Sequence, residues 1–236
     1  MGEYLHINYQ PDVGWVLTIM SRLQNSSKPE LRKAFDQWHE TPLKELGLAI
    51  TTRMHMLGLC IKRLNKRVDE LRREMSADIP QVEECLSKGY AFRLKDKELP
   101  YELLLDMDSF IFETRSLYEI MGKFLVSLFQ TLFARHMTEG EIQSTLSSAG
   151  IDVRWIEDLR ENRKLFFHDT APWLAARFLR ENSNFDPVLL KRNVIEFDDP
   201  DSWIDFIELR QIYDGFVNSA GELHRFLMEQ IRLRET

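Results

Sequence analysis

A repeat of apolar residues between positions 43 and 75 constrains the fold more than any other feature of the sequence. One apolar series recurs every seven residues, and a second follows members of the first by four. The two series are Leu43, Ile50, Leu57, Leu64 and Leu71, and Met54, Ile61, Val68 and Met75. This alternation places one apolar seam along a helix of about nine turns. Thr41 and Pro42 suit the N-cap and the first helical position, so we predict that the helix starts there.

Further segments also have helical periodicity. The second predicted long helix covers about residues 101–136, with one apolar stripe along it. The third covers about 153–167, and the last begins near Ser202, where a Ser-x-x-Asp sequence resembles a capping box. A short helix is expected at 139–148. Four amphipathic helices are the number that a bundle needs to bury all of its stripes. We therefore predict a mainly α fold, an up-and-down four-helix bundle with short accessory helices.

The predicted organisation is a single helical domain over residues 1–236. Residues 1–40 form an N-terminal accessory segment with one or two short helices, and residues 41–234 form the bundle. The stretch at about 172–197 lacks helical periodicity and contains β-prone residues, so we predict a small β-hairpin insertion there. The β-prone stretches are 187–190 and 194–195.

Composition and charge narrow the functional classes. The chain has only 10 glycines and 8 prolines, which favours long helices over turn-rich strands. Its 31 Lys and Arg against 38 Asp and Glu give a net charge of −7, which argues against a non-specific nucleic-acid coat but allows a local basic site. Cys60 and Cys85 have no zinc-site spacing, which favours a reducing compartment. No stretch is apolar enough to span a bilayer. We expect a cytoplasmic protein without a membrane partner.

The usual short catalytic motifs do not occur. The sequence has no GxGxxG or GxxxxGK[ST] phosphate loop, no Gly-x-Ser-x-Gly elbow and no His-Glu-x-x-His zinc motif. We therefore expect no metal and no cofactor, and look for chemistry that side chains can perform alone.

One segment, residues 159–169, has the sequence Leu-Arg-Glu-Asn-Arg-Lys-Leu-Phe-Phe-His-Asp and contains Arg163-x4-His168. This spacing resembles the Arg-x(4–6)-His signature of the HEPN superfamily, four-helix up-and-down bundles that occur in toxins, CRISPR ribonucleases and phage-defence proteins. In that superfamily the signature lies near the end of the third bundle helix, which is where this segment falls. The family often has Asn, Asp or His directly after the arginine. Here Lys164 takes that position, and Asn162 precedes the arginine.

The resemblance implies metal-independent RNA binding or cleavage by a homodimer, in defence or a toxin–antitoxin system. A separately encoded antitoxin or nucleotidyltransferase would be a natural partner. His168 would move a proton near neutral pH, and the Arg163 guanidinium would stabilise the charge on the phosphate. Asn162, Lys164 and Glu113 would bind substrate or support the site.

The position of Arg163 leaves alternatives open. On a helical wheel it lies in the middle of the apolar face, so it either pairs with a carboxylate in the bundle or faces a cleft or subunit interface. Glu113 is the candidate carboxylate. On a regular helix Arg163 and His168 lie about 140° apart, so they would converge only between two copies. Alternatively, Arg163 forms a structural ion pair, His168 interacts with a helix dipole, and the protein is a non-enzymatic oligomerisation module.

Overall fold

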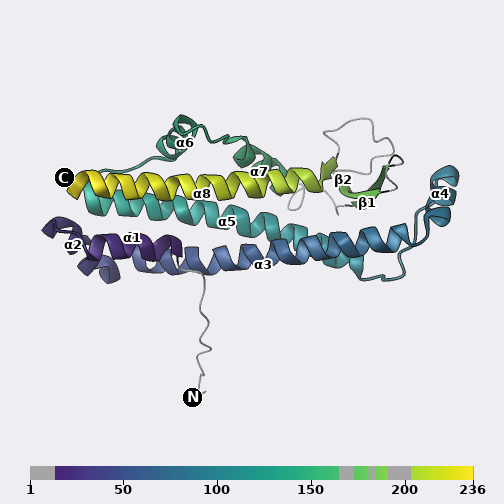
Figure 1. Cartoon of the computed structure of the whole chain (residues 1–236), viewed down its shortest axis with the longest axis horizontal. Coiled ribbons are helices and arrows are strands. Elements are labelled where there is room, and N and C mark those ends of the chain that lie inside the picture. The colour runs from purple at the N-terminus through teal and green to yellow at the C-terminus, as the bar shows by residue number, and fades with distance from the viewer. Residues whose placement is uncertain (1–13, 165–172, 180, 182–183, 191–202, 236) are drawn as a thin grey trace, which may run out of the picture. The chain divides into compact units, whose positions relative to one another are not determined.

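The computed structural model describes residues 14–164, 173–179, 181, 184–190 and 203–235 (Figure 1). These residues form a mainly helical structure with a small antiparallel sheet. The helices are α1 (Gly14–Gln24), α2 (Pro29–Asp36), the 3-10 helix η1 (Gln37–Glu40), α3 (Leu43–Ser76), α4 (Ile79–Lys88), α5 (Leu99–Phe133), α6 (Glu139–Ser148), α7 (Arg154–Lys164) and α8 (Phe206–Glu235). The strands are β1 (Trp173–Leu179), β2 (Asn184–Leu190) and β3 (Trp203–Asp205).

The chain divides into two compact units, and the three long helices α3, α5 and α8 contribute residues to both. Unit 1 consists of Met1–Leu57, Ser116–Ile151 and Asn218–Thr236. Unit 2 consists of Gly58–Arg115 and Asp152–Val217. Among the residues described, no helix has the length and hydrophobicity needed to cross a membrane.

Helix α3 confirms the helix predicted from the heptad repeat. The seven-residue series is buried along its whole length, from Leu43 to Leu71. The helix starts just after Pro42, whose carbonyl accepts the first backbone hydrogen bond, from Leu46 at 3.0 Å. Thr41 ends the preceding η1, and its hydroxyl donates to the Trp38 carbonyl at 3.0 Å.

Unit 1 packs the accessory helices against the long ones. The indole N–H of Trp15 on α1 donates to the carbonyl of Ala220 on α8 at 2.9 Å. The rings of Trp15 and Trp38 each approach Phe124 on α5 edge-on, at 5.6 and 5.7 Å between ring centres. Large aromatic side chains bury much apolar area, so these contacts form a core for unit 1. One or two short helices were expected in residues 1–40, and the structure has two α-helices, α1 and α2, and the 3-10 helix η1 there.

Of the short helices α4 and α6, only α6 was predicted from the sequence. Helix α6 has the predicted bounds, and a capping box between Thr138 and Glu141 opens it. Helix α4 was not predicted. Its signals are present, since Asp78 accepts a hydrogen bond from the Gln81 N–H at 3.2 Å and Gly89 follows at φ +69°.

The small sheet corrects the predicted β-hairpin. Strands β1 and β2 pair antiparallel, with Ala175 opposite Val188, and β2 also pairs with β3. The insertion was predicted in the right place, and the stretch 187–190 belongs to β2. However, β1 was not foreseen and a third strand is added, while 194–195 lies outside the described residues. The sequence of β1, Trp-Leu-Ala-Ala-Arg-Phe-Leu, lacks the alternation that marks a half-buried strand.

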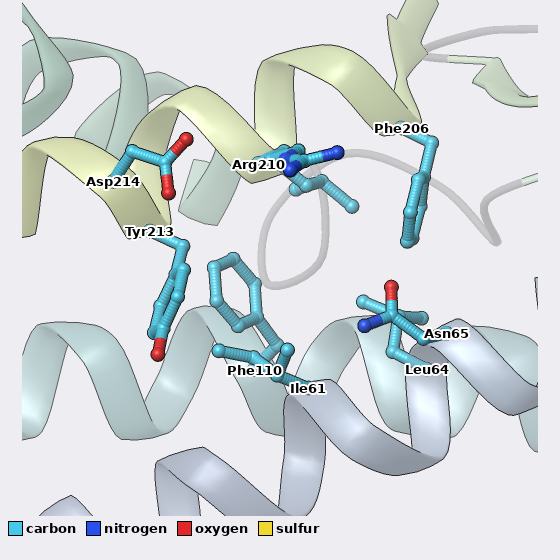
Figure 2. Close-up of a pocket in the computed structure, with 9 residues that line it drawn as sticks. Ile61, Leu64, Asn65, Phe110, Phe206, Arg210, Tyr213 and Asp214 are labelled. Carbon is cyan, nitrogen blue, oxygen red and sulfur yellow. The ribbon is translucent and has the colours of Figure 1, made fainter.

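Unit 2 brings its segments of α3, α5 and α8 around a pocket of about 230 Å³ (Figure 2). Of its lining residues, Phe110 on α5, Leu64 and Leu209 are buried. The pocket lies wholly within this unit.

Candidate functional site

The helix that contains the proposed arginine, α7, docks through one apolar face. Asp152 precedes the helix, and its carboxylate accepts from the Arg154 N–H at 2.9 Å, which satisfies a free donor of the first turn. Trp155, Ile156 and Leu159 are all buried. Their spacing of one, three and four residues places them on one side of the helix.

Gly215 on α8 leaves room for the side chain of Trp155, the largest of these three residues. A Cβ at Gly215 would lie 2.5 Å from atoms of the Trp155 ring, closer than side chains approach one another. The same indole meets the ring of Phe216 edge-on, at 5.9 Å and 84°. The close approach of α7 to α8 therefore depends on the absence of a side chain at Gly215.

Asn162 anchors the C-terminal end of α7 to α8. Its side chain is 1% exposed. Its amide nitrogen donates to the Asp158 carbonyl at 2.8 Å and to the Glu208 carboxylate on α8 at 2.9 Å. Within the described residues, the amide oxygen has no hydrogen-bond partner. A buried acceptor without a hydrogen bond costs folding free energy. This oxygen could therefore accept a hydrogen bond from a further donor.

The partner of Asn162 lies in the first turn of α8. The N–H of Glu208 donates to the Asp205 carboxylate at 2.7 Å, so Asp205 caps the helix. The predicted capping residue, Ser202, lies outside the described residues. A carboxylate at Glu208 also interacts favourably with the positive end of the helix dipole.

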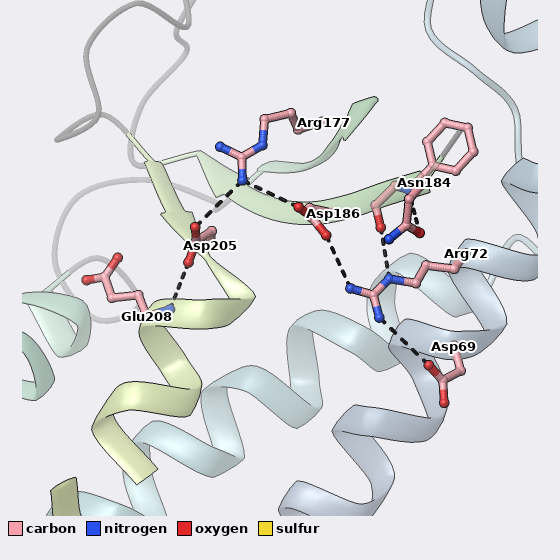
Figure 3. A network of polar contacts seen from close by, with 8 residues as sticks. Asp69, Arg72, Arg177, Asn184, Asp186, Asp205 and Glu208 are labelled. Carbon is pink, nitrogen blue, oxygen red and sulfur yellow. Dashed lines mark hydrogen bonds and ion pairs between the residues drawn. The ribbon is translucent and has the colours of Figure 1, made fainter. Parts of the chain in front are cut away.

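An ion-pair network continues from Asp205 across the sheet to α3 (Figure 3). Arg177 on β1 lies 3.8 Å from Asp205 and 3.4 Å from Asp186 on β2. Asp186 is also 3.2 Å from Arg72 of α3, whose Nε donates to the Phe185 carbonyl at 2.9 Å. Alternating charges of this kind form a network rather than isolated pairs. The network ties all three strands to the capped start of α8.

The predicted site residues can be placed to different extents. Arg163 and Lys164 are the last two residues of α7, directly after Asn162, and their side chains are not among the described parts. His168 lies outside the described residues. Glu113 is buried on α5, at 6% exposure. Asn162 is thus anchored to Glu208, while its supporting role in a site and the pairing of Arg163 with Glu113 stay predictions.

A second buried carboxylate, Asp106, was missed by the sequence analysis. It lies seven residues before Glu113 on the same face of α5 and pairs with Arg63 of α3 at 2.9 Å. Burial raises the pKa of the nearby Cys60 thiol; Arg63 lowers that pKa, and the two carboxylates raise it. Such a thiol stays protonated and unreactive. The sequence did contain a signal for this residue, because Asp106 and Glu113 are two acidic residues seven positions apart within an otherwise apolar helix.

Over the described ranges, no group of three or more His, Cys, Asp or Glu side chains is arranged to hold a metal ion. Comparisons of the chain with protein-family models, with curated proteins and with solved structures find no match.

Proposed function

We propose that the chain is an RNA-binding protein of the HEPN type that cleaves RNA without a metal ion and acts as a homodimer. The observation that best supports this proposal is the anchoring of Asn162 to Glu208 at 2.9 Å. It holds the end of α7, where the Arg163-x4-His168 motif begins, against the capped first turn of α8. A site that binds a phosphate needs such a fixed backbone, because small displacements of a catalytic group cost much of the rate.

The proposed architecture is a four-helix up-and-down bundle made of α3, α5, α7 and α8. Each of these helices buries an apolar stripe, which is what helices in a bundle require. The signature would then lie at the end of the third bundle helix, with the small sheet inserted before the fourth. This arrangement is similar to that of the HEPN superfamily.

The proposed reaction is transesterification within the RNA backbone. The 2′-oxygen bonds to phosphorus as the bond to the 5′-oxygen breaks, so a proton leaves the 2′-hydroxyl and another reaches the leaving oxygen. His168 would transfer these protons. Arg163 would bind the phosphate oxygens as their negative charge grows, with Lys164 adding positive charge. Asn162 and Glu113 would position the site.

Homodimerisation is supported by an exposed apolar stripe on α5. Tyr101, Leu105 and Phe112 are separated by four and seven residues, so they share one face of the helix. All three are substantially exposed, Leu105 at 63%. Clusters of exposed apolar side chains commonly mark interaction sites. A second copy of the chain could cover this stripe and bring two motifs together.

The cellular setting proposed is cytoplasmic, in defence or in a toxin–antitoxin pair with a separately encoded antitoxin or nucleotidyltransferase. The two cysteines are free thiols, in keeping with a reducing compartment. The rest of this setting rests on the resemblance of the Arg163-x4-His168 motif alone.

A second candidate function is a non-enzymatic module that associates through its long helices. The exposed apolar stripe at Tyr101, Leu105 and Phe112 supports this function as well as it supports the nuclease. Two copies can associate through this face of α5 without any catalytic activity. Cleavage or binding of RNA by the purified protein distinguishes the two candidate functions.

The test is to incubate purified protein with single-stranded RNA and with DNA of the same sequence, in the presence of EDTA. The nuclease proposal predicts that RNA is cut to products ending in a 2′,3′-cyclic phosphate and that DNA stays intact. A protein that neither cuts nor binds RNA at low salt contradicts the proposal and leaves only the association module.

A further inference from the structure

We propose that a second pocket of unit 2, between the end of α3, helix α4 and strand β1, binds the alkyl chain of a fatty acid. The pocket has a volume of about 470 Å³. Helix α3 contributes Leu71 and Met75 to its lining, and β1 contributes Leu174 and Phe178. The residues proposed for RNA cleavage are not among those that line it. This inference therefore does not rest on the nuclease proposal.

The walls of the pocket come from elements that each present one apolar face. On α4, Val82, Cys85 and Leu86 are three and four residues apart and lie on the same side of the helix. Opposite positions of β1 and β2 supply two aromatic rings, since Phe178 stacks on Phe185 with 4.9 Å between the ring centres. The pocket is thus shaped by packed side chains of a helix and a sheet.

The pocket has a buried floor and an exposed apolar mouth. Leu71, Val82 and Phe185 are buried, so the floor exists before any ligand binds. By contrast, Leu86 is 52% exposed and Tyr90 is 68% exposed. Removing such apolar surface from water is favourable. A ligand that enters the pocket therefore gains free energy from covering both floor and mouth.

The lining selects a hydrocarbon rather than a peptide or a sugar. Among the sixteen residues that line the pocket, the side chains of Cys85 and Tyr90 alone can donate a hydrogen bond, and none is charged. A peptide would bring amide groups into this pocket, and a polar group buried without a hydrogen bond is costly. An alkyl chain has no such groups.

The volume sets the length of the chain. A cavity of ~150 Å³ holds one six-carbon ring, so a pocket about three times as large has room for roughly twelve to sixteen carbons. Met75 in the lining is flexible and can adapt to a chain of varying shape. The ligand is therefore a medium to long alkyl chain.

The segment beside the pocket favours an anionic head group. Residues 88–97 contain four basic residues and one acidic residue, a net charge of +3, in a chain whose net charge is −7. Within this segment Phe92 and Leu94 line the pocket, and the exposed Arg93 and Lys95 alternate with them. Among the residues that the structure describes, the side chains of Arg93 and Lys95 have no ion-pair partner. A carboxylate at the mouth would lie in this positive field.

The first experiment measures binding of dodecanoate and decanoate to the full chain by isothermal titration calorimetry, below the concentrations at which they form micelles. Dodecanoate should bind about tenfold more tightly, because each of its two further methylenes contributes roughly 0.8 kcal/mol on burial. Dodecyltrimethylammonium has the same chain and a cationic head, so it should bind more weakly. This difference should shrink in about 1 M salt, which screens exposed charges.

Two pairs of variants locate the ligand. Ala176→Phe places a ring in the pocket and should weaken binding of dodecanoate at least tenfold, as expected for the loss of about 1.4 kcal/mol or more. Ala149→Phe, at an exposed alanine outside the pocket, should bind like the wild type. Arg93→Gln should weaken dodecanoate but not dodecyltrimethylammonium. Lys62→Gln removes an exposed charge of α3 away from the pocket and should have no effect.

Cys85 reports on the pocket in the unmodified protein. Cys85 lines the pocket and is half-buried, whereas Cys60 is buried. Saturating dodecanoate should slow the reaction of Cys85 with a maleimide at least severalfold, because the bound chain covers the thiol. Cys85→Ser should remove this reaction, which shows that Cys85 is the residue labelled.

The proposal is overturned if dodecanoate does not bind at millimolar concentration, or if it binds without protecting Cys85. It is also overturned if a folded Ala176→Phe binds dodecanoate like the wild type. If Ala176→Phe does not fold, the protection of Cys85 decides. Equal binding of dodecanoate and dodecyltrimethylammonium contradicts the anionic head group. Protection of Cys85 by phosphatidylglycerol vesicles but not by dodecanoate would assign the pocket to a membrane surface instead.

Discussion

The amide nitrogen of Asn162 on α7, a buried side chain, donates to the half-buried carboxylate of Glu208 on α8 across 2.9 Å. The two residues are 46 apart in the chain, and the intervening chain includes the small sheet. The bond joins the residue before Arg163 to a helix start that Asp205 caps. The end of α7, where Arg163 lies, is therefore held to this helix start by one amide group.

Removing the Asn162 amide should destabilise the protein. Asn162→Ala leaves the Glu208 carboxylate without its buried donor, so the free energy of unfolding should fall by about 1–3 kcal/mol. Urea denaturation measures the change. Asn25→Ala is a matched control, because Asn25 also donates to the carbonyl four residues earlier but is exposed. Its effect should stay within about 0.5 kcal/mol. Equal effects of the two variants would show that the Glu208 contact adds no stability.

Two glycines on α8 should respond in opposite directions to alanine. Gly215→Ala places a Cβ against Trp155 and should destabilise by about 1–3 kcal/mol through overpacking. Gly221→Ala has open space around it and should stabilise by about 0.5–1 kcal/mol, the helix preference of alanine over glycine. Thermal melts compare the two. If both variants melt above the wild type, α7 does not need the close approach to α8.

Acid should weaken unit 1 through His224. Its Nε2 lies 2.6 Å from the Thr18 hydroxyl, its ring lies 5.7 Å from that of Trp15, and burial lowers its pKa below the usual value of 6.5. As the pH falls below about 6.5, the unfolded state binds a proton first. The stabilising contribution is therefore complete above that pH and is lost as the pH falls toward the folded-state pKa.

His224→Gln removes the titrating group, so the unfolding free energy should fall less between pH 7.5 and 5.5 than in the wild type. Urea denaturation at the two pH values measures this. Identical pH slopes for wild type and variant would contradict the assignment to His224.

The apolar stripe on α5 should hold the dimer together. Sedimentation should give a mass near 56 kDa at micromolar concentration, twice the 28.0 kDa of the chain. Leu105→Glu should shift the species to monomer, because a charge would be desolvated in the interface. Leu233→Glu changes another exposed leucine, on α8, and should remain a dimer. A wild type that sediments only as monomer contradicts the two-copy site.

The sequence predicts the helices better than the strands, for a physical reason. The repeat from Leu43 to Met75 continues over many turns, so each added turn strengthens the prediction. By contrast, β3 has only three residues, Trp203–Asp205, too few for an alternating pattern. Its place is set by pairing with β2, in which Leu190 lies opposite Trp203, rather than by its own sequence. Such pairing has no local signal.

The sequence shows the candidate motif but not the contacts that anchor the helix carrying it. The Arg163-x4-His168 spacing is visible in the sequence, and Asn162 was singled out beside it. The role of Glu208 as the partner of Asn162 was not predicted, because 46 residues separate the two in the chain. Asp106 was missed for the same reason: its partner Arg63 lies on another helix. Sequence spacing locates groups on one helix, whereas contacts between helices require the fold.

Replacing His168 with alanine tests the central claim most directly. In single-turnover RNA cleavage with EDTA present, His168→Ala should lower the rate by about 100- to 10,000-fold, the usual loss for a general acid or base. Arg163→Ala should also lose activity while changing the free energy of unfolding by less than about 1 kcal/mol. His39→Ala, at an exposed histidine of η1, should cleave like the wild type. Cleavage by His168→Ala at the wild-type rate would contradict the account, as would a loss of about 3–5 kcal/mol in Arg163→Ala, which marks a broken buried ion pair.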